Sequence, residues 1–99
     1  MSGQMTPIAH PGWVLGRELA ARKLSANRLS IDISVPSGCI TNILNGRRSI
    51  TADTAIRLGR YFGNRPQFWL DLQSQFDVAA VERTKGKEIA KRQRPADAA

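Results

Sequence analysis

The chain has 99 residues, 41% of them hydrophobic, and a formal net charge of +7. This length allows one small domain with a modest core, and the charge favours a polyanionic partner, of which nucleic acid is the commonest. The single cysteine, Cys39, excludes an intrachain disulfide. No apolar run approaches the ~18 residues of a membrane span, and the opening MSGQMTPIAHPG is unlike a secretory signal. We therefore expect a cytoplasmic protein that is not attached to a membrane.

The first two predicted helices are short and amphipathic. HPG at residues 10–12 opens a helix that we expect over residues 12–23, with Leu15 and Leu19 on its inner face. Ser25 is a suitable N-cap for a second helix over residues 26–33, because its hydroxyl can accept a hydrogen bond from a free backbone amide of the first turn.

The stretch SVPSGCITNILNGRRSIT at residues 34–51 predicts a third helix from Ser37 to Leu44. The hydroxyl of Ser37 can cap its first turn, and Asn45-Gly46 ends it, since glycine tolerates the left-handed backbone that closes a helix. Only three residues separate this helix from the second one. Such a brief turn forces the two helices to cross steeply, which is helix-turn-helix geometry.

Two further helices follow. Thr51 is a suitable N-cap for a fourth helix over residues 52–62, and Pro66 suits the first turn of a fifth helix, expected to end near Gln75. Residues 78–83 fit either a strand or a last helical turn. From Thr84 onward the chain is charged and rich in alanine, which predicts disorder. The resulting organisation is all-α: a flexible N-terminus at residues 1–9, a five-helix domain at 10–83 and a disordered basic tail at 84–99.

The outer face of the third helix is small and polar. The inner surface shared by the second and third helices is expected to consist of Leu29, Ile33, Val35, Ile40 and Ile43, with the small Ser30 where the helices come closest. The residues that remain outside are Ser37, Gly38, Thr41 and Asn42. A slim helix fits the DNA major groove, which is about 12 Å wide, and asparagine, serine and threonine can bond to base edges.

Basic and amide side chains flank this helix. Asn45, Arg47 and Arg48 follow it where its end would approach the sugar-phosphate backbone, and such contacts position a protein without reading sequence. Ser25, Asn27 and Arg28 begin the second helix and can hold the other flank of the groove. Alone, Arg47-Arg48 would suggest a solvated turn; beyond a slim polar helix, the pair predicts phosphate contacts.

The sequence gives no pattern that predicts catalysis. His10 is the only histidine and precedes a helix, where it is expected to cap or turn the chain. Cys39 has no evident base, and Asp71 and Asp77 form no obvious carboxylate pair. We expect no catalytic residue, no metal site and no cofactor.

The fifth helix carries an apolar stripe. The simplest expectation is that this stripe packs into the hydrophobic core. A two-fold symmetric DNA reader also needs a self-complementary surface, however. We therefore predict that part of this helix forms a homodimer contact. Its residues are Phe68, Trp69, Asp71, Leu72, Gln75 and Phe76.

The segment LSANRLSIDISVPSGCITNILNGRRSIT resembles the helix-turn-helix of the phage-repressor-like (XRE) superfamily. HPGWVLGREL at residues 10–19 and ITADTAIRLGRYFGNRPQFWLDLQSQFD at 50–77 narrow the resemblance to the HigA antitoxin family, over roughly residues 8 to 78. The resemblance implies the antitoxin of a type II toxin–antitoxin pair. Such a protein binds an inverted repeat in operator DNA as a homodimer, represses its own operon and neutralises a HigB toxin, a RelE-like ribonuclease that cleaves mRNA.

Carried over by position, the resemblance implies base reading by the outer residues of the third helix and backbone contacts by Asn45, Arg47 and Arg48. Ser34 stands where the family's turn usually has glycine, so a left-handed backbone there would be strained. Trp13 replaces a usually acidic residue and Ile31 lies on a face expected to be polar; each is either a partner contact or packed under a neighbouring loop. A stand-alone helix-turn-helix transcriptional regulator and a protein-binding adaptor that does not read DNA are the alternative functions.

Overall fold

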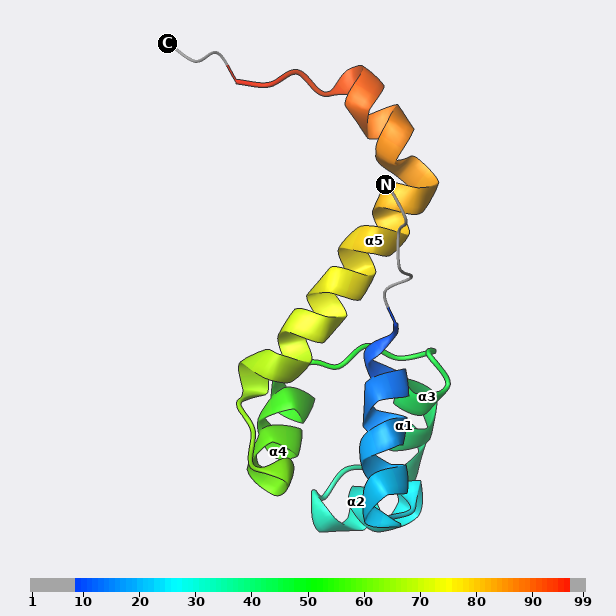
Figure 1. The fold of residues 1–99 in the computed structure, drawn as a ribbon, viewed down its shortest axis with the longest axis vertical. Helices are drawn as coiled ribbons and strands as arrows, with labels where there is room; N and C mark the ends of the chain where they lie inside the picture. The colour runs from blue at the N-terminus through cyan, green and yellow to red at the C-terminus, as the bar shows by residue number, and fades with distance from the viewer. Residues whose placement is uncertain (1–8, 97–99) are drawn as a thin grey trace.

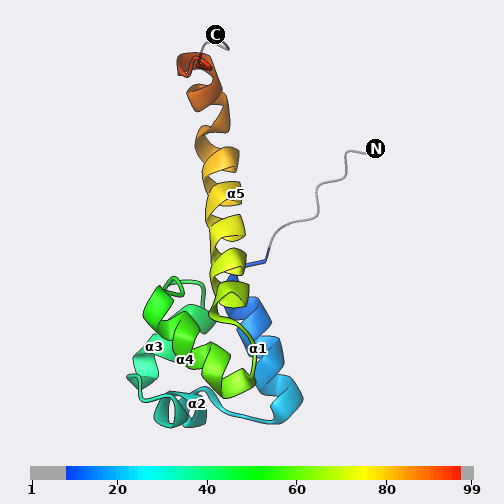
Figure 2. The same cartoon turned by 90° about the vertical axis from the view of Figure 1, so that its left-hand side faces the viewer.

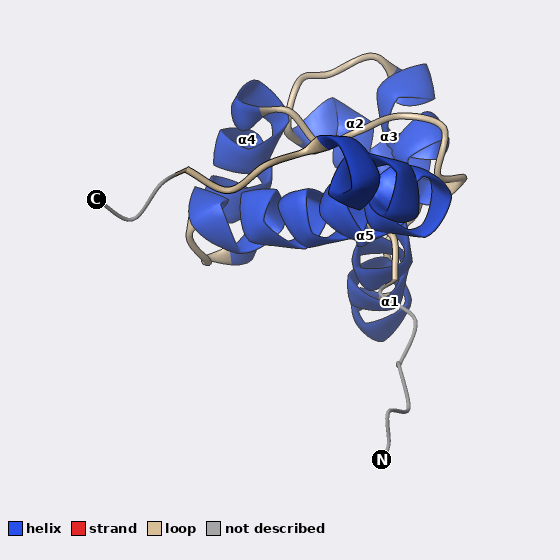
Figure 3. Ribbon diagram, turned by 90° about the horizontal axis from the view of Figure 1, so that it is seen from above, coloured by secondary structure: helices blue, strands red, loops and turns tan. Residues whose placement is uncertain are grey.

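A computed structural model of the protein describes residues 9–96, in which five helices form all of the regular secondary structure. The chain order is α1 (Pro11–Arg22), α2 (Ala26–Asp32), α3 (Ser37–Leu44), α4 (Ala52–Phe62) and α5 (Pro66–Arg92) (Figure 1). Figure 3 shows only helices and connecting loops in this part of the chain. The predicted all-α, five-helix fold is confirmed. None of the helices in residues 9–96 is long and apolar enough to cross a membrane.

The core lies where α1 to α4 meet the beginning of α5. In this cluster α1 packs against α3 and α5, α2 packs against α3, and α4 packs against α5 (Figure 2). The buried hydrophobic residues are Leu15, Leu19, Leu29, Ile33, Cys39, Ile40, Ile43, Ile50, Ala55, Leu58 and Trp69. The predicted inner surface between α2 and α3 is confirmed for Leu29, Ile33, Ile40 and Ile43, with Ser30 also buried, whereas Val35 is only partly buried against it.

Local capping bonds explain where most of the helices begin. The Ser25 hydroxyl accepts a hydrogen bond from the Arg28 amide at 3.0 Å, as predicted, and Thr51 accepts one from the Thr54 amide at 3.3 Å. His10 Nδ1 accepts from the Gly12 amide at 2.9 Å, so this histidine caps α1. The prediction for Ser37 is wrong: Pro36 is the N-cap of α3, and no side chain caps this helix. Ser37 is already helical, one position too far along the chain for its hydroxyl to cap.

Gly12 allows α1 to lie directly on the end of α3. A Cβ at this position would overlap the backbone carbonyl of Ile43. The overlapping group is main chain, so it cannot rotate away as a side chain can. Glycine is therefore required for this close packing of α1 on α3.

α5 is much longer than the sequence predicted. It continues past Gln75 to Arg92, so residues 78–83 are helical and the prediction of disorder is wrong for residues 84–92. Once a helix is nucleated each added residue costs little, and the alanine, lysine and glutamate of this segment are good helix formers. Lys91 and Arg92 lie in the last turn, where positive charge interacts favourably with the helix dipole.

The distal part of α5 gives the molecule its elongated shape, with principal extents of 52 × 31 × 22 Å (Figure 1). Residues 93–96 follow the helix without regular secondary structure. The predicted flexible N-terminus, except for Ala9, and the last three residues of the predicted tail lie outside the described residues.

Candidate nucleic-acid interface

α3 presents the polar edge that its sequence predicted. Ser37, Gly38 and Thr41 are exposed and Asn42 is half-buried, while the opposite side of the helix is buried through Cys39, Ile40 and Ile43. A Cβ built on Gly38 would meet no atom within 4 Å, so the space in front of this edge is open. The helix is therefore held from behind by apolar packing and has a slim, accessible front, as insertion into a major groove requires.

The loop after α3 carries two arginines that have no carboxylate partner among the described residues. Gly46 has a left-handed backbone with φ of 75°, and the Arg47 amide donates to the Asn42 carbonyl at 2.8 Å, which closes the helix end as predicted. Asn45, Arg47 and Arg48 are all exposed. Neither arginine forms an ion pair with a carboxylate within residues 9–96, whereas four other arginines do: Arg22, Arg28, Arg57 and Arg92.

At the beginning of α2 lies a second polar group, in which the arginine charge is paired with a carboxylate. Ser25, Asn27 and Arg28 are exposed there, but Arg28 Nε lies 3.2 Å from Asp32 Oδ1. The other carboxylate oxygen of Asp32 accepts a hydrogen bond from the Tyr61 hydroxyl at 2.7 Å, and this bond is the main cause that raises the pKa of Tyr61. The Arg28 charge is thus shared with a carboxylate, unlike that of Arg47 or Arg48.

Arg57, which the sequence did not single out, supports the turn between α2 and α3. Its Nη1 donates to the carbonyl of Ile33 at 2.7 Å and to that of Ser34 at 3.3 Å, and its Nε donates to Asp53 at 2.7 Å. Ser34 has a φ of 61°, so the expected left-handed backbone is present at a non-glycine residue. The guanidinium therefore binds the free carbonyls at the end of α2, where the chain turns toward α3.

Gln73 is a second support that the sequence did not reveal. Its side chain is buried and its Oε1 accepts a hydrogen bond from the Ile50 amide at 2.8 Å, while its Nε2 donates to Asp77 at 3.0 Å. Ile50 lies only two residues after Arg48. Gln73 therefore ties α5 to the loop that carries the free arginines.

The six residues of the predicted dimer contact on α5 differ in exposure. Trp69 was wrongly included: it is fully buried, and its Nε1 donates to Asn64 Oδ1 at 3.0 Å. Leu72 packs against the core, and the ring of Phe76 lies edge-on to His10, 4.8 Å between centroids. The members that remain exposed are Phe68, Asp71 and Gln75. The spacing of these positions showed which residues share a face of the helix, but not which face α4 covers.

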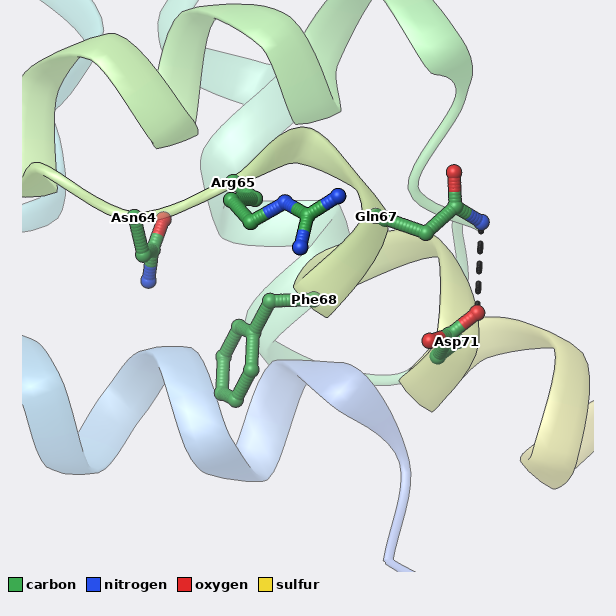
Figure 4. Close-up of a pocket in the computed structure, with 5 residues that line it drawn as sticks. All are labelled: Asn64, Arg65, Gln67, Phe68 and Asp71. Carbon is green, nitrogen blue, oxygen red and sulfur yellow. Dashed lines mark hydrogen bonds between the residues drawn. The ribbon is translucent and has the colours of Figure 1, made fainter.

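An open hollow lies beside the exposed part of this set. Its lining residues are Asn64, Arg65, Gln67, Phe68 and Asp71, and Figure 4 shows the Phe68 ring extending toward the neighbouring helix while Gln67 donates to Asp71. The hydrogen bond from Gln67 Nε2 to Asp71 Oδ1 measures 3.2 Å. The hollow thus combines one exposed aromatic ring with a carboxylate.

The two residues that depart from the family pattern are both exposed. Trp13 is 57% exposed, with the Arg17 guanidinium 5.0 Å from the centre of its ring, and Ile31 is 60% exposed. Neither is packed under a neighbouring loop, so that interpretation is wrong for both. Cys39, in contrast, is buried in the hydrophobic core.

Comparison with known proteins places this architecture among the antitoxins. No protein-family model matches the chain. Virulence-associated protein I of Dichelobacter nodosus is 42% identical over 80 residues, which are 80% of this chain and 74% of that protein. The solved structure of an addiction module antidote protein of the HigA family from Coxiella burnetii has a TM-score of 0.88 and 46% identity, covering 93% of this chain and 100% of that one.

Pseudomonas aeruginosa antitoxin HigA, solved with the higBA promoter, has a TM-score of 0.87 and 36% identity, covering 91% of this chain and 99% of that one. In both structural comparisons, the similarity extends over nearly the whole length of this chain and of the other chain. It includes the helix-turn-helix and the beginning of α5, which the sequence resemblance had indicated. The chain belongs to the HigA antitoxin family.

Proposed function

We propose that this protein is the antitoxin of a type II toxin–antitoxin module. It binds an inverted repeat in its operator as a homodimer, represses its own operon and neutralises a HigB-like toxin, a RelE-like ribonuclease that cleaves mRNA. The observation that carries the proposal is the open, polar edge of α3 beside two arginines that have no carboxylate partner within residues 9–96. The Pseudomonas relative, solved with promoter DNA, supports the same reading.

The residues divide into base readers and backbone contacts. Ser37, Gly38, Thr41 and Asn42 lie on the edge that enters the major groove, and the amide of Asn42 suits adenine, to which asparagine can bond through two atoms. Phosphate contacts fall to Asn45, Arg47 and Arg48 on one flank, and to Ser25, Asn27 and Arg28 on the other. In a homodimer, the two α3 helices reach successive major grooves about 34–36 Å apart.

Arg47→Ala and Arg48→Ala test the backbone contacts. Each is expected to weaken binding to every DNA sequence by a similar factor and to lower the salt dependence of binding by about one counterion, because one phosphate contact is lost. Fluorescence anisotropy over a salt series on operator and unrelated DNA measures both effects. Arg17→Ala, on the outer side of α1, is the matched control and should leave the slope unchanged.

Asn42→Ala tests base reading. It is expected to relax the preference at one base pair per half-site, by about 1–3 kcal/mol, while the salt dependence stays the same. A panel of operators, each with a single base change, measures this discrimination. If the asparagine and both arginine variants bound as the natural protein does, DNA reading would be refuted and the protein-binding adaptor would be the better explanation.

We place this protein in the cytoplasm, where operator DNA and translated mRNA are both present. The antitoxin activity is tested with the toxin itself. The toxin is the product expected from the open reading frame next to this one. Addition of an equimolar amount of this protein is expected to stop mRNA cleavage in a translation extract. Unchanged cleavage, together with intact operator binding, would instead identify a stand-alone transcriptional regulator.

Trp13 is the residue most suited to the toxin contact. It is a large, exposed aromatic ring on α1, and aromatic residues of this kind often dominate protein–protein binding energies. Trp13→Ala should weaken toxin inhibition and leave operator affinity unchanged. Ile31→Ala, which removes an equally exposed apolar side chain from α2, is the control for a general effect of surface apolar residues.

A further inference from the structure

Two polar side chains of α4 bind the turn between α2 and α3. Arg57 and Tyr61 lie four residues apart, so they share one face of α4. Arg57 Nη1 donates to the carbonyls of Ile33 and Ser34, and the Tyr61 hydroxyl donates to the Asp32 carboxylate. Three consecutive residues where α2 ends are therefore bonded to α4, which lies beside α2 (Figure 2). We call Arg57 and Tyr61 the α4 latch.

The α4 latch crosses an open hollow between α4 and this turn. The residues that line the hollow are Asp32, Ile33, Ser34, Arg57, Arg60 and Tyr61. Only Ile33 among them is buried. Little apolar surface is therefore covered at this place, and directional hydrogen bonds connect the turn to α4.

The turn needs this support because Ser34 has a left-handed backbone, with φ of 61°. Residues with a Cβ rarely adopt this conformation, whereas glycine adopts it readily. The two carbonyls that Arg57 binds belong to the peptide groups immediately before and after the Ser34 Cα. The guanidinium therefore fixes the two groups whose orientation defines the left-handed conformation.

The conformation of Ser34 sets the direction of α3, which begins three residues later. Ile40 and Ile43 hold α3 against the core, but apolar packing is not directional. A rotation of about 10° at the start of this helix, which is about 12 Å long, would move its far end by about 2 Å. The donor–acceptor distance of an N–H···O hydrogen bond varies only between about 2.7 and 3.2 Å. Base reading by Asn42 therefore requires a fixed turn.

Tyr61 connects α4 to the second group of proposed DNA contacts. One oxygen of the Asp32 carboxylate accepts from the Tyr61 hydroxyl at 2.7 Å, and the other lies 3.2 Å from Arg28 Nε. Arg28 is one of the proposed phosphate contacts at the beginning of α2. The α4 latch is thus linked both to the base-reading edge of α3 and to the phosphate contacts of α2.

We propose that Arg57 and Tyr61 are positioning residues for operator recognition. The α4 latch fixes the angle between α2 and α3, so that the base-reading edge and the phosphate contacts meet one duplex together. This inference rests on the proposed operator binding and assigns the control of its geometry to α4. The latch acts without touching DNA. It therefore affects the discrimination between operator and other DNA but not the salt dependence, which reports phosphate contacts.

The double variant R57M/D53N tests the latch without a change in net charge. It removes Arg57 together with the Asp53 carboxylate that binds the guanidinium at 2.7 Å. Operator affinity is expected to fall about tenfold, because the hydrogen bonds that hold the turn are lost. Affinity for unrelated DNA and the slope of the salt dependence should stay unchanged. R22M/E18Q removes the equivalent pair from α1 and is the matched control. Fluorescence anisotropy over a salt series measures all of these quantities.

Ser34→Gly tests whether Arg57 acts through the turn. Glycine adopts the left-handed backbone without strain, so the turn then needs less support. In the Ser34→Gly background, R57M/D53N should lower operator affinity by about threefold or less, in place of about tenfold. An equal loss in the two backgrounds would show that Arg57 does not act through Ser34, and would refute the latch.

Tyr61→Phe is a milder test, because it removes only one hydroxyl from an exposed side chain. Operator affinity is expected to fall about threefold as Asp32 loses one hydrogen bond. Affinity for unrelated DNA should again be unchanged. This variant also decides the question if R57M/D53N does not fold, which urea unfolding would show.

The outcomes separate the α4 latch from the proposed function. A natural chain that binds operator and unrelated DNA equally well would refute operator reading and the latch together. A natural chain that discriminates, with R57M/D53N and Tyr61→Phe variants that discriminate just as well, would refute the latch alone. Weaker binding of R57M/D53N to both DNAs, with a lower salt slope, would make Arg57 a direct phosphate contact and would contradict its positioning role.

Discussion

The two halves of α5 have the same backbone conformation for different reasons. Residues 66–77 include the buried Trp69 and Gln73 and pack against α4 and α1, whereas none of residues 78–92 is buried. The first half is helical because packing holds one of its faces, and the second because its residues favour a helix and an existing helix extends easily. Secondary structure alone therefore does not show which part of this protein belongs to its core, and substitutions in the two halves should have very different effects.

Gly12→Ala should destabilise the protein more than any other variant considered. The added methyl would overlap the Ile43 carbonyl, so α1 and α3 must separate, at a cost of about 3 kcal/mol in the free energy of unfolding. Urea unfolding followed by circular dichroism measures the change. An unfolding free energy close to that of the natural protein would show that α1 does not lie on α3 as described.

Gln73→Met should cause the second-largest loss in the free energy of unfolding. Its removal leaves the buried Ile50 amide without an acceptor, which costs about 1–3 kcal/mol. Operator affinity should also fall, because the loop that carries Arg48 loses its attachment to α5. Gln67→Met removes a more exposed hydrogen bond from the same helix and should change stability by less than about 0.5 kcal/mol. Equal losses in the two variants would contradict the special role of Gln73.

Gly38→Ala and Gly86→Ala compare the two regions directly with one chemical change. Each replaces a helical glycine, so each should favour its own helix by up to about 1 kcal/mol. Gly38→Ala lies in the helix-turn-helix domain and should raise the urea midpoint of that domain. The new methyl group should also lower operator affinity, because it widens the polar edge of α3.

For Gly86→Ala, measured where the chain is monomeric, we expect slower amide hydrogen exchange in residues 78–92 and an unchanged urea midpoint. A midpoint raised as much as by Gly38→Ala would show that the distal half of α5 unfolds together with the domain, and the distinction between the two halves would fail.

The smallest effect is expected from the protonation of His10. Partial burial lowers the pKa of this imidazole from its ordinary value of 6.5, and the nearby Asp77 carboxylate opposes that shift. The folded protein therefore binds fewer protons at this site than the unfolded chain, so stability is highest above pH 6.5 and declines as the pH falls through the folded pKa. His10→Asn keeps an acceptor at the N-cap and should have a flatter stability profile between pH 7 and 5. Identical profiles would exclude His10 as a source of the dependence.

The local features of this protein follow from its amino-acid sequence. The caps Ser25 and Thr51, the helix end at Gly46 and the polar edge of α3 were all predictable. An N-cap bond joins residues only two or three positions apart, and a helical face follows from its spacing. The failure at Ser37 was an error of one position within the same rule. The family, too, was visible in the motifs on both sides of the helix-turn-helix.

Contacts between distant parts of the chain determine which helix faces are covered and what holds the loop that carries Arg47 and Arg48. The bond from Ile50 to Gln73 joins residues 23 positions apart and that from Arg57 to Ile33 joins residues 24 apart, so no local pattern shows both partners. The burial of Trp69 depends on where α4 packs. Phe68, Asp71 and Gln75 lie on the same helix but stay exposed, because no other helix of the described chain covers them. Local rules act over one helical turn, whereas burial is a property of helices brought together from distant parts of the chain.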